Sequence, residues 1–323
     1  MHPLIDRRSM LLSAAALGAA AFTTSRSAEA AAPITGPTGS PYTRYKVGEF
    51  EITAFNDGTR VTGNPEKIFG VNQKPEDVGT AAEANFLPKD RMVNSFTPVL
   101  VNTGKELVLF DSGNGANGRP ATGQLAAQMK AAGVAAEDID VVVITHCHPD
   151  HIGGLMDNGA PLAPKARYVI GEAEYAFWSS PDRANGPTAN AAKIVQANVV
   201  PNKDKMTFVK NEGEVVSGIR AIEAFGHTPG HMAWHVESQG KRILIGADFC
   251  NHYVLSMQHP KWHVSFDADK DGAVATRLKL LDMLSADRIP FTSYHMPFPA
   301  VGFVEKGAGD GYRFVPASYQ LML

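Results

Sequence analysis

The segment ITHCHPDHIGG, at residues 144–154, constrains the fold and chemistry of this chain more than any other segment. It places three of the 11 histidines and an aspartate within six positions: His146, His148, Asp150 and His151. In extended chain, residues i and i+2 point to the same side, so His146 and His148 can reach one metal ion. Pro149 then redirects the chain, so Asp150 and His151 can reach a second ion. Hydrogen bonds to other groups of the protein do not explain so many polar side chains in one short segment. The motif therefore predicts a metal site at a strand end.

Three later segments offer further ligands, each after an apolar run. They are FGHTPGH with His227 and His231, ILIGADFC with Asp248, and FTSYHMPFP with His295. Each alone is equally explained as a polar residue of a turn. However, a carboxylate at the end of a strongly apolar strand is costly unless it is paired or coordinated. Together with the histidine motif, His227, Asp248 and His295 complete a predicted site of seven ligands.

The N-terminal residues predict an export signal. Arg7 and Arg8 precede an apolar run at residues 10–22 that is short for a membrane span and rich in Ala and Gly. The tripeptide AEA at residues 28–30 fits a cleavage site. We therefore predict a twin-arginine signal peptide at residues 1–30, a flexible Pro- and Gly-rich leader at 31–41, and a periplasmic or secreted protein.

The remaining residues, 42–323, are predicted to form a single domain with a sizeable core. Hydrophobic residues make up 44% of the chain and the formal net charge is -3, which excludes a disordered chain and gives no electrostatic reason to bind nucleic acid. No later apolar run is long enough to span a membrane. Two cysteines, Cys147 and Cys250, do not make a disulfide framework.

The pattern of apolar residues predicts an alternation of strands and helices. Strands are expected at 45–59, 96–104, 106–113, 138–145, 166–172, 216–226, 232–240, 241–248 and 289–295. Helices are expected at 122–133 and 271–287, and residues 62–95 are expected to form a long loop with a short helix. This order favours two packed sheets flanked by helices.

The order of these motifs resembles the metallo-β-lactamase superfamily, an α/β fold in which an αββα sandwich of two mixed sheets carries a two-metal site at one edge. The resemblance implies that His146, His148 and His227 hold one ion. It implies that Asp150, His151 and His295 hold the other, and that Asp248 bridges both. Asp111, in LFDSG, matches an aspartate that orients the ligands, and His231 is expected to lie outside the ligand set.

Longer segments resemble one group of this superfamily, the methyl parathion hydrolase group of exported bacterial enzymes. The similarity runs from Tyr45 to Tyr319 and includes GEFEITAFNDGT, VESQGKRILIGAD and GYRFVPASY. Trp178 matches an aromatic residue of that group's substrate pocket. Two features depart from the group: Gly118 stands where its phosphotriesterase has a pocket phenylalanine, and residues 186–198 lack an aromatic residue expected there.

These features predict a hydrolase with two divalent ions per chain, with zinc expected and Mn, Fe or Co also compatible with the ligand types. Two ions holding a water between them give a hydroxide at neutral pH, which attacks an ester or lactone, with phosphotriesters as a possible side substrate. Asp150 or Asp248 is expected to pass the proton to the leaving group. The partner is thus a small-molecule substrate.

Two other functions remain open from the sequence. A β-lactamase uses a Lys, Arg or Asn to hold the substrate carboxylate, and no such residue is identifiable by spacing. An exported metal-binding protein without catalysis would keep the ligands for structure alone. A homodimer is also possible, because the aromatic-rich segment at residues 252–266 is equally explained as a dimer contact or as part of the pocket mouth.

Overall fold

Two seven-stranded sheets form the centre of the computed structural model, which describes residues 39–307, 309–317, 319 and 322–323. The predicted signal peptide and most of the leader lie outside the described residues. The first sheet has the order β1-β2-β5-β6-β7-β10-β11. Its strands are β1 (Tyr42–Val47), β2 (Phe50–Phe55), β5 (Val99–Asn102), β6 (Leu107–Phe110), β7 (Val141–Ile144), β10 (Arg167–Gly171) and β11 (Met206–Val209). Strands β6, β7, β10 and β11 run parallel, and the others pair antiparallel.

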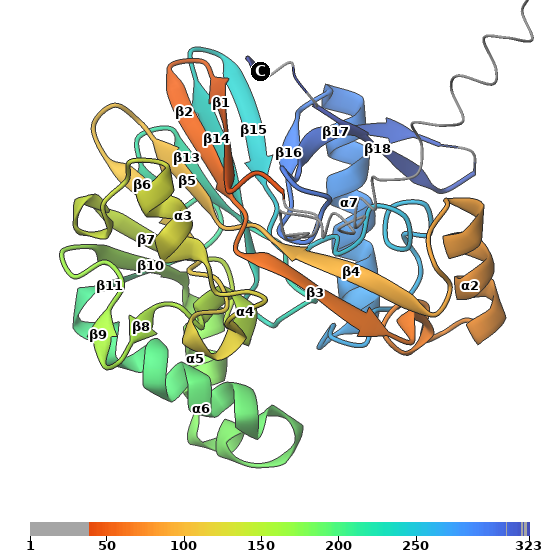
Figure 1. Cartoon of the computed structure of the whole chain (residues 1–323), viewed down its shortest axis with the longest axis horizontal. Helices are drawn as coiled ribbons and strands as arrows, with labels where there is room; N and C mark the ends of the chain where they lie inside the picture. The colour runs from red at the N-terminus through yellow and green to blue at the C-terminus, as the bar shows by residue number, and fades with distance from the viewer. Residues whose placement is uncertain (1–38, 308, 318, 320–321) are drawn as a thin grey trace, which may run out of the picture. The chain divides into compact units, whose positions relative to one another are not determined.

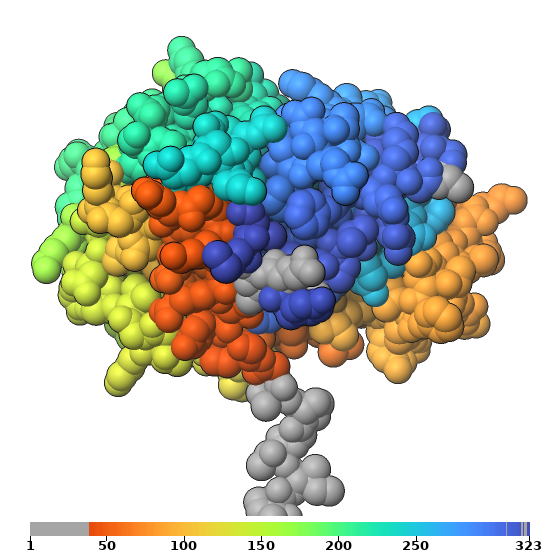
Figure 2. Space-filling view, turned by 90° about the horizontal axis from the view of Figure 1, so that it is seen from above, coloured from red at the N-terminus to blue at the C-terminus, as the bar shows by residue number. Residues whose placement is uncertain are grey.

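The second sheet is built from the C-terminal half and has the order β12-β13-β14-β15-β16-β17-β18. Its strands are β12 (Glu214–Val216), β13 (Ile219–Glu223), β14 (Met232–Ser238), β15 (Lys241–Ile245), β16 (Phe291–Thr292), β17 (Val301–Lys306) and β18 (Tyr312–Pro316). Only β15 and β16 run parallel. A parallel bridge between Lys46 and Met322 sets the chain end beside β1, as the red and dark blue surfaces in Figure 2 show.

The helices are α2 (Pro75–Ala84), α3 (Leu125–Ala131), α4 (Pro149–Ile152), α5 (Glu172–Ser179), α6 (Ala189–Asn198) and α7 (Lys270–Asp287). Helices α3, α5 and α6 cover the outer face of the first sheet and α7 that of the second, whereas α2 lies beside the β3–β4 hairpin (Figure 1). Short 3-10 helices are η1 (Pro65–Lys67), η2 (Ala116–Gly118), η3 (Ala136–Asp138), η4 (Pro181–Ala184), η5 (Gly186–Thr188) and η6 (Val200–Lys205). Two small hairpins complete the fold: β3 (Gly58–Gly63) with β4 (Arg91–Phe96), and β8 (Met156–Asp157) with β9 (Ala160–Pro161).

The apolar side chains divide into three main layers, as expected for a sandwich. One cluster lies between the sheets and combines residues such as Val143 of β7 with Trp234 of β14. A second packs α3, α5 and α6 against the first sheet, and a third packs α7 against the second sheet. Because β7 is buried on both faces, it consists of apolar residues throughout. The predicted αββα architecture of two mixed sheets flanked by helices is therefore confirmed.

Several element predictions need correction. The run 45–59 is not one strand, because Gly48, with a φ of 59°, turns the chain into the hairpin of β1 and β2. Residues 62–95 contain η1, α2 and most of β4, so they are not mainly a loop. Strand β16 has only two residues, and β17 and β18 were not predicted at all. The helix prediction at 271–287 is confirmed by α7 to within one residue.

Residues Ser40–Leu323 form one compact unit. Within it, residues of the segment at 252–266, including Val254, Leu255 and Val264, pack in a fourth apolar cluster with Phe69 and Val78 of the α2 region. The segment thus has an intramolecular apolar contact. Among the described residues, we find no helix with the length and apolar character needed to span a membrane.

Candidate metal centre

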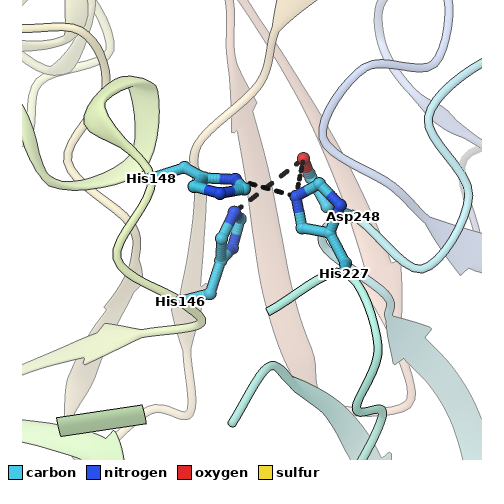
Figure 3. A group of neighbouring side chains, drawn as sticks. All are labelled: His146, His148, His227 and Asp248. Carbon is cyan, nitrogen blue, oxygen red and sulfur yellow. Dashed lines mark hydrogen bonds and ion pairs between the residues drawn. The ribbon is translucent and has the colours of Figure 1, made fainter. Parts of the chain in front are cut away.

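The seven predicted ligands meet at one edge of the sandwich, where strands of both sheets end. They form two groups of side chains: His146, His148, His227 and Asp248, and then Asp150, His151 and His295. Within each group, the candidate ligand atoms all lie within 4.8 Å of one another. Figure 3 shows the first group, with the two histidines that follow β7 on one side and the two ligands from the second sheet on the other.

Local sequence explains how each segment presents its side chains. His146 and His148 follow the buried strand β7, and His148 is the residue before α4. Pro149 begins that one-turn helix, which carries Asp150 and His151. In the second sheet, the ligands follow the ends of β13, β15 and β16. Strand β16 is short because the chain leaves the sheet before His295.

Asp248 lies between the two groups. Its Oδ2 atom is 3.2 Å from Nε2 of His227 and 3.2 Å from Nε2 of His295. Its Oδ1 atom is 3.3 Å from Nε2 of His151. The carboxylate thus contacts histidines of both groups, which is the position that a bridging ligand requires. Ala247, immediately before Asp248, has a φ of 48°, which is a costly conformation for alanine. It turns the backbone that follows β15 toward the site.

The hydrogen bonds at Nδ1 fix which nitrogen of each ring faces the centre. His151 Nδ1 donates to Asp111 Oδ2 at 2.7 Å, and His295 Nδ1 donates to the carbonyl of Ser95 at 2.9 Å. Because the Thr145 hydroxyl donates to Asp111, it must accept from His146 Nδ1, 3.1 Å away. Each of these rings therefore directs its Nε2 atom toward the centre, the arrangement found in metal sites.

Orphaned polar atoms show that the centre fits a metal ion. Nε2 of His146, Nε2 of His151 and Oδ1 of Asp248 are buried and have no hydrogen-bond partner among the described residues. Buried polar atoms without a partner are costly, and coordination to a cation would satisfy all three. Imidazole nitrogen with carboxylate oxygen suits Zn²⁺ and other divalent transition metals.

Burial and the neighbouring carboxylates shift the pKa values of the candidate histidine ligands in opposite directions. Burial and the neighbouring His227 lower the pKa of His148 to about 3, which leaves that ring in the neutral form that binds metals. Burial also acts on His227, but hydrogen bonds to Asp248 and Asp267 outweigh it and raise its pKa to about 9. At His295, the nearby carboxylates of Asp248 and Asp150 likewise outweigh burial and raise the pKa to about 10.

The family model of the metallo-beta-lactamase superfamily matches residues 94–290, well over half of the chain. The chain belongs to the metallo-beta-lactamase superfamily. The matched range contains six of the seven candidate ligands, and His295 lies just beyond it.

Members of this superfamily with similar sequences and structures include lactonases. N-acyl homoserine lactonases of Bacillus sp and Bacillus cereus are 26% and 25% identical over 44% and 46% of this chain. The matches cover 54% and 57% of those proteins, so the chain spans about half the length of the curated relatives it matches.

Two solved structures of the superfamily are similar over nearly the whole described unit. AidC, a dizinc quorum-quenching lactonase in complex with a product, is 28% identical, with a TM-score of 0.79 over 86% of this chain and 98% of AidC. The hydrolase AbOPH is 26% identical, with a TM-score of 0.80 over 87% of this chain and 98% of AbOPH. Neither similarity identifies the methyl parathion hydrolase group, which stays a prediction.

The predicted outer residues lie as follows. Asp111 accepts from His151 and from Thr145, with a φ of 61° that an aspartate tolerates. His231 belongs to neither ligand group: its Nδ1 donates to the carbonyl of Ala224, and its Nε2 accepts from the backbone N–H of Asp248. It therefore holds the bridging candidate through the backbone.

Trp178, predicted to line the substrate pocket, is only 4% exposed. Its ring packs edge-to-face on His148, with centroids 6.1 Å apart, and its Nε1 donates to Glu174. The described contacts thus place Trp178 beside a candidate ligand, and a substrate contact stays a prediction. The candidate ligands that are not fully buried are His148, Asp150 and His295, with side-chain exposures of 23% for Asp150 and 12% for His295, whereas Asp248 is 3% exposed.

Sequence reasoning missed several residues that hold the ligands, among them Asp267, Arg277 and Asn251. Asp267 Oδ1 accepts from His227 Nδ1 at 2.8 Å, and its Oδ2 accepts from the buried guanidinium of Arg277. Asn251 Nδ2 donates to Asp248 Oδ2 at 3.0 Å. A charged residue facing the core within the predicted helix at 271–287 was the one available signal, for Arg277, because Asp267 and Asn251 lie in irregular chain.

Proposed function

We propose that this chain is a metal-dependent hydrolase of lactones and related esters, with two divalent ions per chain and zinc as the expected metal. The position of Asp248 between two groups of ligands carries the proposal, because a shared carboxylate is what a two-metal hydrolase needs and a single structural ion does not. Similarity to lactonases supports lactones, including N-acyl homoserine lactones, as the substrate class.

The side chains have separate tasks in the proposed reaction. Two bound ions supply Lewis acidity and lower the pKa of water. His146, His151, His227 and His295 would bind through Nε2, because their Nδ1 atoms are held by outer partners. His148 would bind through Nδ1, which faces His227. Asp248 is held by Asn251 and by the backbone contact to His231, so it is fixed in place. Asp150 is the more exposed carboxylate, and we assign to its Oδ2 the transfer of a proton to the leaving alcohol oxygen.

A hydrolysis panel tests this function with the purified protein, its metal content measured beforehand. The panel contains an N-acyl homoserine lactone, dihydrocoumarin, an aryl acetate, methyl parathion and a β-lactam, each with zinc-loaded and chelated protein. We expect the highest kcat/KM on a lactone or aryl ester, lost on chelation and restored by Zn²⁺. Faster β-lactam turnover would favour the β-lactamase alternative. No turnover of any substrate with two ions bound would leave a metal-binding protein.

We also propose that the protein acts outside the cytoplasm, in the periplasm or as a secreted protein. Arg7 and Arg8 before a weakly apolar run support the twin-arginine route. That route carries folded proteins, which suits a chain that binds its ions before export. A homodimer remains a prediction.

A further inference from the structure

Glu174 is a fully buried carboxylate that the proposed reaction does not use. It lies in the first turn of α5, with a relative exposure of 0%. Its Oε1 atom accepts from the backbone N–H of Cys147 at 2.7 Å and from Nε1 of Trp178 at 2.8 Å. Its Oε2 atom accepts from the hydroxyl of Thr228 at 2.7 Å and from the N–H of Gly230 at 3.0 Å. Four donors on an acceptor-only group compensate its burial.

The donors belong to two segments that carry candidate ligands. Cys147 stands between His146 and His148, after a strand of the first sheet, whereas Thr228 directly follows His227, after a strand of the second sheet. One carboxylate therefore ties together both sides of the first ligand group. Trp178 adds a second link, because the indole that donates to Glu174 also packs on the ring of His148.

Close backbone packing shows that this contact is built into the fold. A Cβ atom added at Gly230 would overlap the backbone nitrogen of Glu174 and lie 2.5 Å from its Cα atom. A Cβ atom at Gly171, directly before α5, would lie 2.8 Å from the carbonyl oxygen of Gly230. The start of α5 and the turn after His227 thus approach as closely as glycine allows, which fixes where the carboxylate reaches.

We propose that Glu174 is a positioning residue that sets the spacing between the His146–His148 segment and His227, and thereby the metal affinity of the first ligand group. The inference rests on the proposed metal centre but not on any substrate. Glutamine has nearly the same shape but replaces one acceptor oxygen by an NH₂ group. That group would face either Cys147 N–H and Trp178 N–H or Gly230 N–H, and each of these is a donor that cannot rotate to accept.

The test is Zn²⁺ titration of the chelated mature protein by calorimetry, comparing the parent with Glu174→Gln. The titration is repeated in an Asp150→Ala background, which weakens the second group so that the remaining high-affinity site reports the first group. We expect Glu174→Gln to weaken the first site about 10–100-fold, the usual effect of losing an outer partner of a metal ligand, and to change the second site less than about threefold. The absorption spectrum of the Co²⁺-loaded Glu174→Gln variant should differ from that of the Co²⁺-loaded parent.

Asp57→Asn is the matched control. Asp57 is likewise 0% exposed and accepts four hydrogen bonds, from Asn114 N and Nδ2, Gly123 N and Leu125 N, none of which belongs to a segment of the first group. We expect it to lower the melting temperature as Glu174→Gln does, with the first site unchanged. Equal losses of affinity in the two variants, or parental affinity in Glu174→Gln, would overturn the proposal.

A milder variant decides the matter if Glu174→Gln does not fold. Thr228→Val keeps the shape of a fully buried side chain and removes one of the four donors. It should weaken the first site in the same direction by a smaller factor, and an unchanged first site would contradict the proposal. Because no substrate is used, a parent that binds two ions but hydrolyses no lactone would refute the proposed function and leave the role of Glu174 standing.

Discussion

Asp267 Oδ1 accepts a hydrogen bond from His227 Nδ1 at 2.8 Å, while Oδ2 of the same carboxylate lies 3.2 Å from the Arg277 guanidinium. All three side chains are buried. Arg277 in turn donates to the backbone carbonyls of Phe249, Pro260 and Trp262, so α7 and the loop around Asp267 are fixed to each other. The orientation of a candidate ligand on one strand end thus depends on a helix on the outer face of the sheet.

Replacing Asp267 by asparagine should weaken zinc binding about 10–100-fold, because the amide cannot accept from both His227 and Arg277. Zinc titration of the chelated protein measures this. Asp282→Asn, on the exposed side of α7, is the control and should bind zinc as the parent does. Parental affinity in Asp267→Asn would show that the Nδ1 contact does not orient His227.

Replacing Asp248 by alanine should remove the contact shared by the two ligand groups. We expect the metal content to fall from the proposed two ions per chain and the hydrolytic activity to fall by about two orders of magnitude or more, beyond the effect of losing an outer partner. Elemental analysis of the gel-filtered variant and its parent is the measurement. Two ions in a well-folded Asp248→Ala sample would rule out the bridging role.

Chelation should lower the melting temperature. A ligand that binds only the folded state at about 100 times its Kd stabilises it by about 2.7 kcal/mol, which shifts the melting temperature of a domain of this size by about 4–5 °C. Thermal melts with a chelator, and then with increasing Zn²⁺, measure the shift. Mg²⁺ is the control ion, since it prefers all-oxygen ligands. A melting temperature independent of Zn²⁺ would argue against metal binding.

A lactone or aryl ester should be hydrolysed more efficiently than methyl parathion. Two aromatic residues of the phosphotriesterase pocket are expected to be absent, one at Gly118 and one in residues 186–198. Each aromatic contact with a substrate ring is worth roughly 0.5–1.5 kcal/mol beyond the area it buries, so losing two lowers kcat/KM for methyl parathion by about one or two orders of magnitude. Kinetics with the zinc-loaded protein compare dihydrocoumarin with methyl parathion. A preference for the phosphotriester would contradict this prediction.

Gly118→Phe should not restore phosphotriester activity. A Cβ atom at Gly118 would overlap Oγ1 of the buried Thr122 and lie 2.7 Å from Cβ of Asn114. We therefore expect the variant to lose stability instead of gaining a substrate contact. Thermal melts and kinetics on both substrates test this, and a stable variant with increased phosphotriester turnover would contradict it.

Export should depend on the paired arginines. Changing Arg7 and Arg8 to lysine should hold the precursor in the cytoplasm of a bacterium with the twin-arginine route. Immunoblots of cytoplasmic and periplasmic fractions measure this. A substitution of Lys46, which lies in β1 and outside the predicted signal peptide, serves as the control. Equal export of the lysine variant and the parent would exclude the route.

The grouping of the candidate ligands could be predicted from sequence because each follows an apolar strand and the first four stand in one short motif. The residues that hold them could not, because Glu174 and Asp267 are single carboxylates without local pattern, recruited by tertiary contacts 27 and 40 positions away. Likewise, β1 and β2 share one alternation across Gly48, so periodicity alone does not show the turn. Strand β16 was predicted too long because Pro290, directly before it, has no N–H for the ladder, and the chain leaves the sheet after Thr292 toward His295.

The first ligand group also has a consequence for the order of folding. His148 and His227 lie 79 residues apart in the chain and come from different sheets, with Nδ1 and Nε2 only 2.9 Å apart. Neither sheet alone brings the pair together, so this group is complete only when the two halves of the sandwich have docked. During synthesis, an ion can therefore be captured at full affinity only after the second sheet has been made, and metal uptake would mark the end of folding.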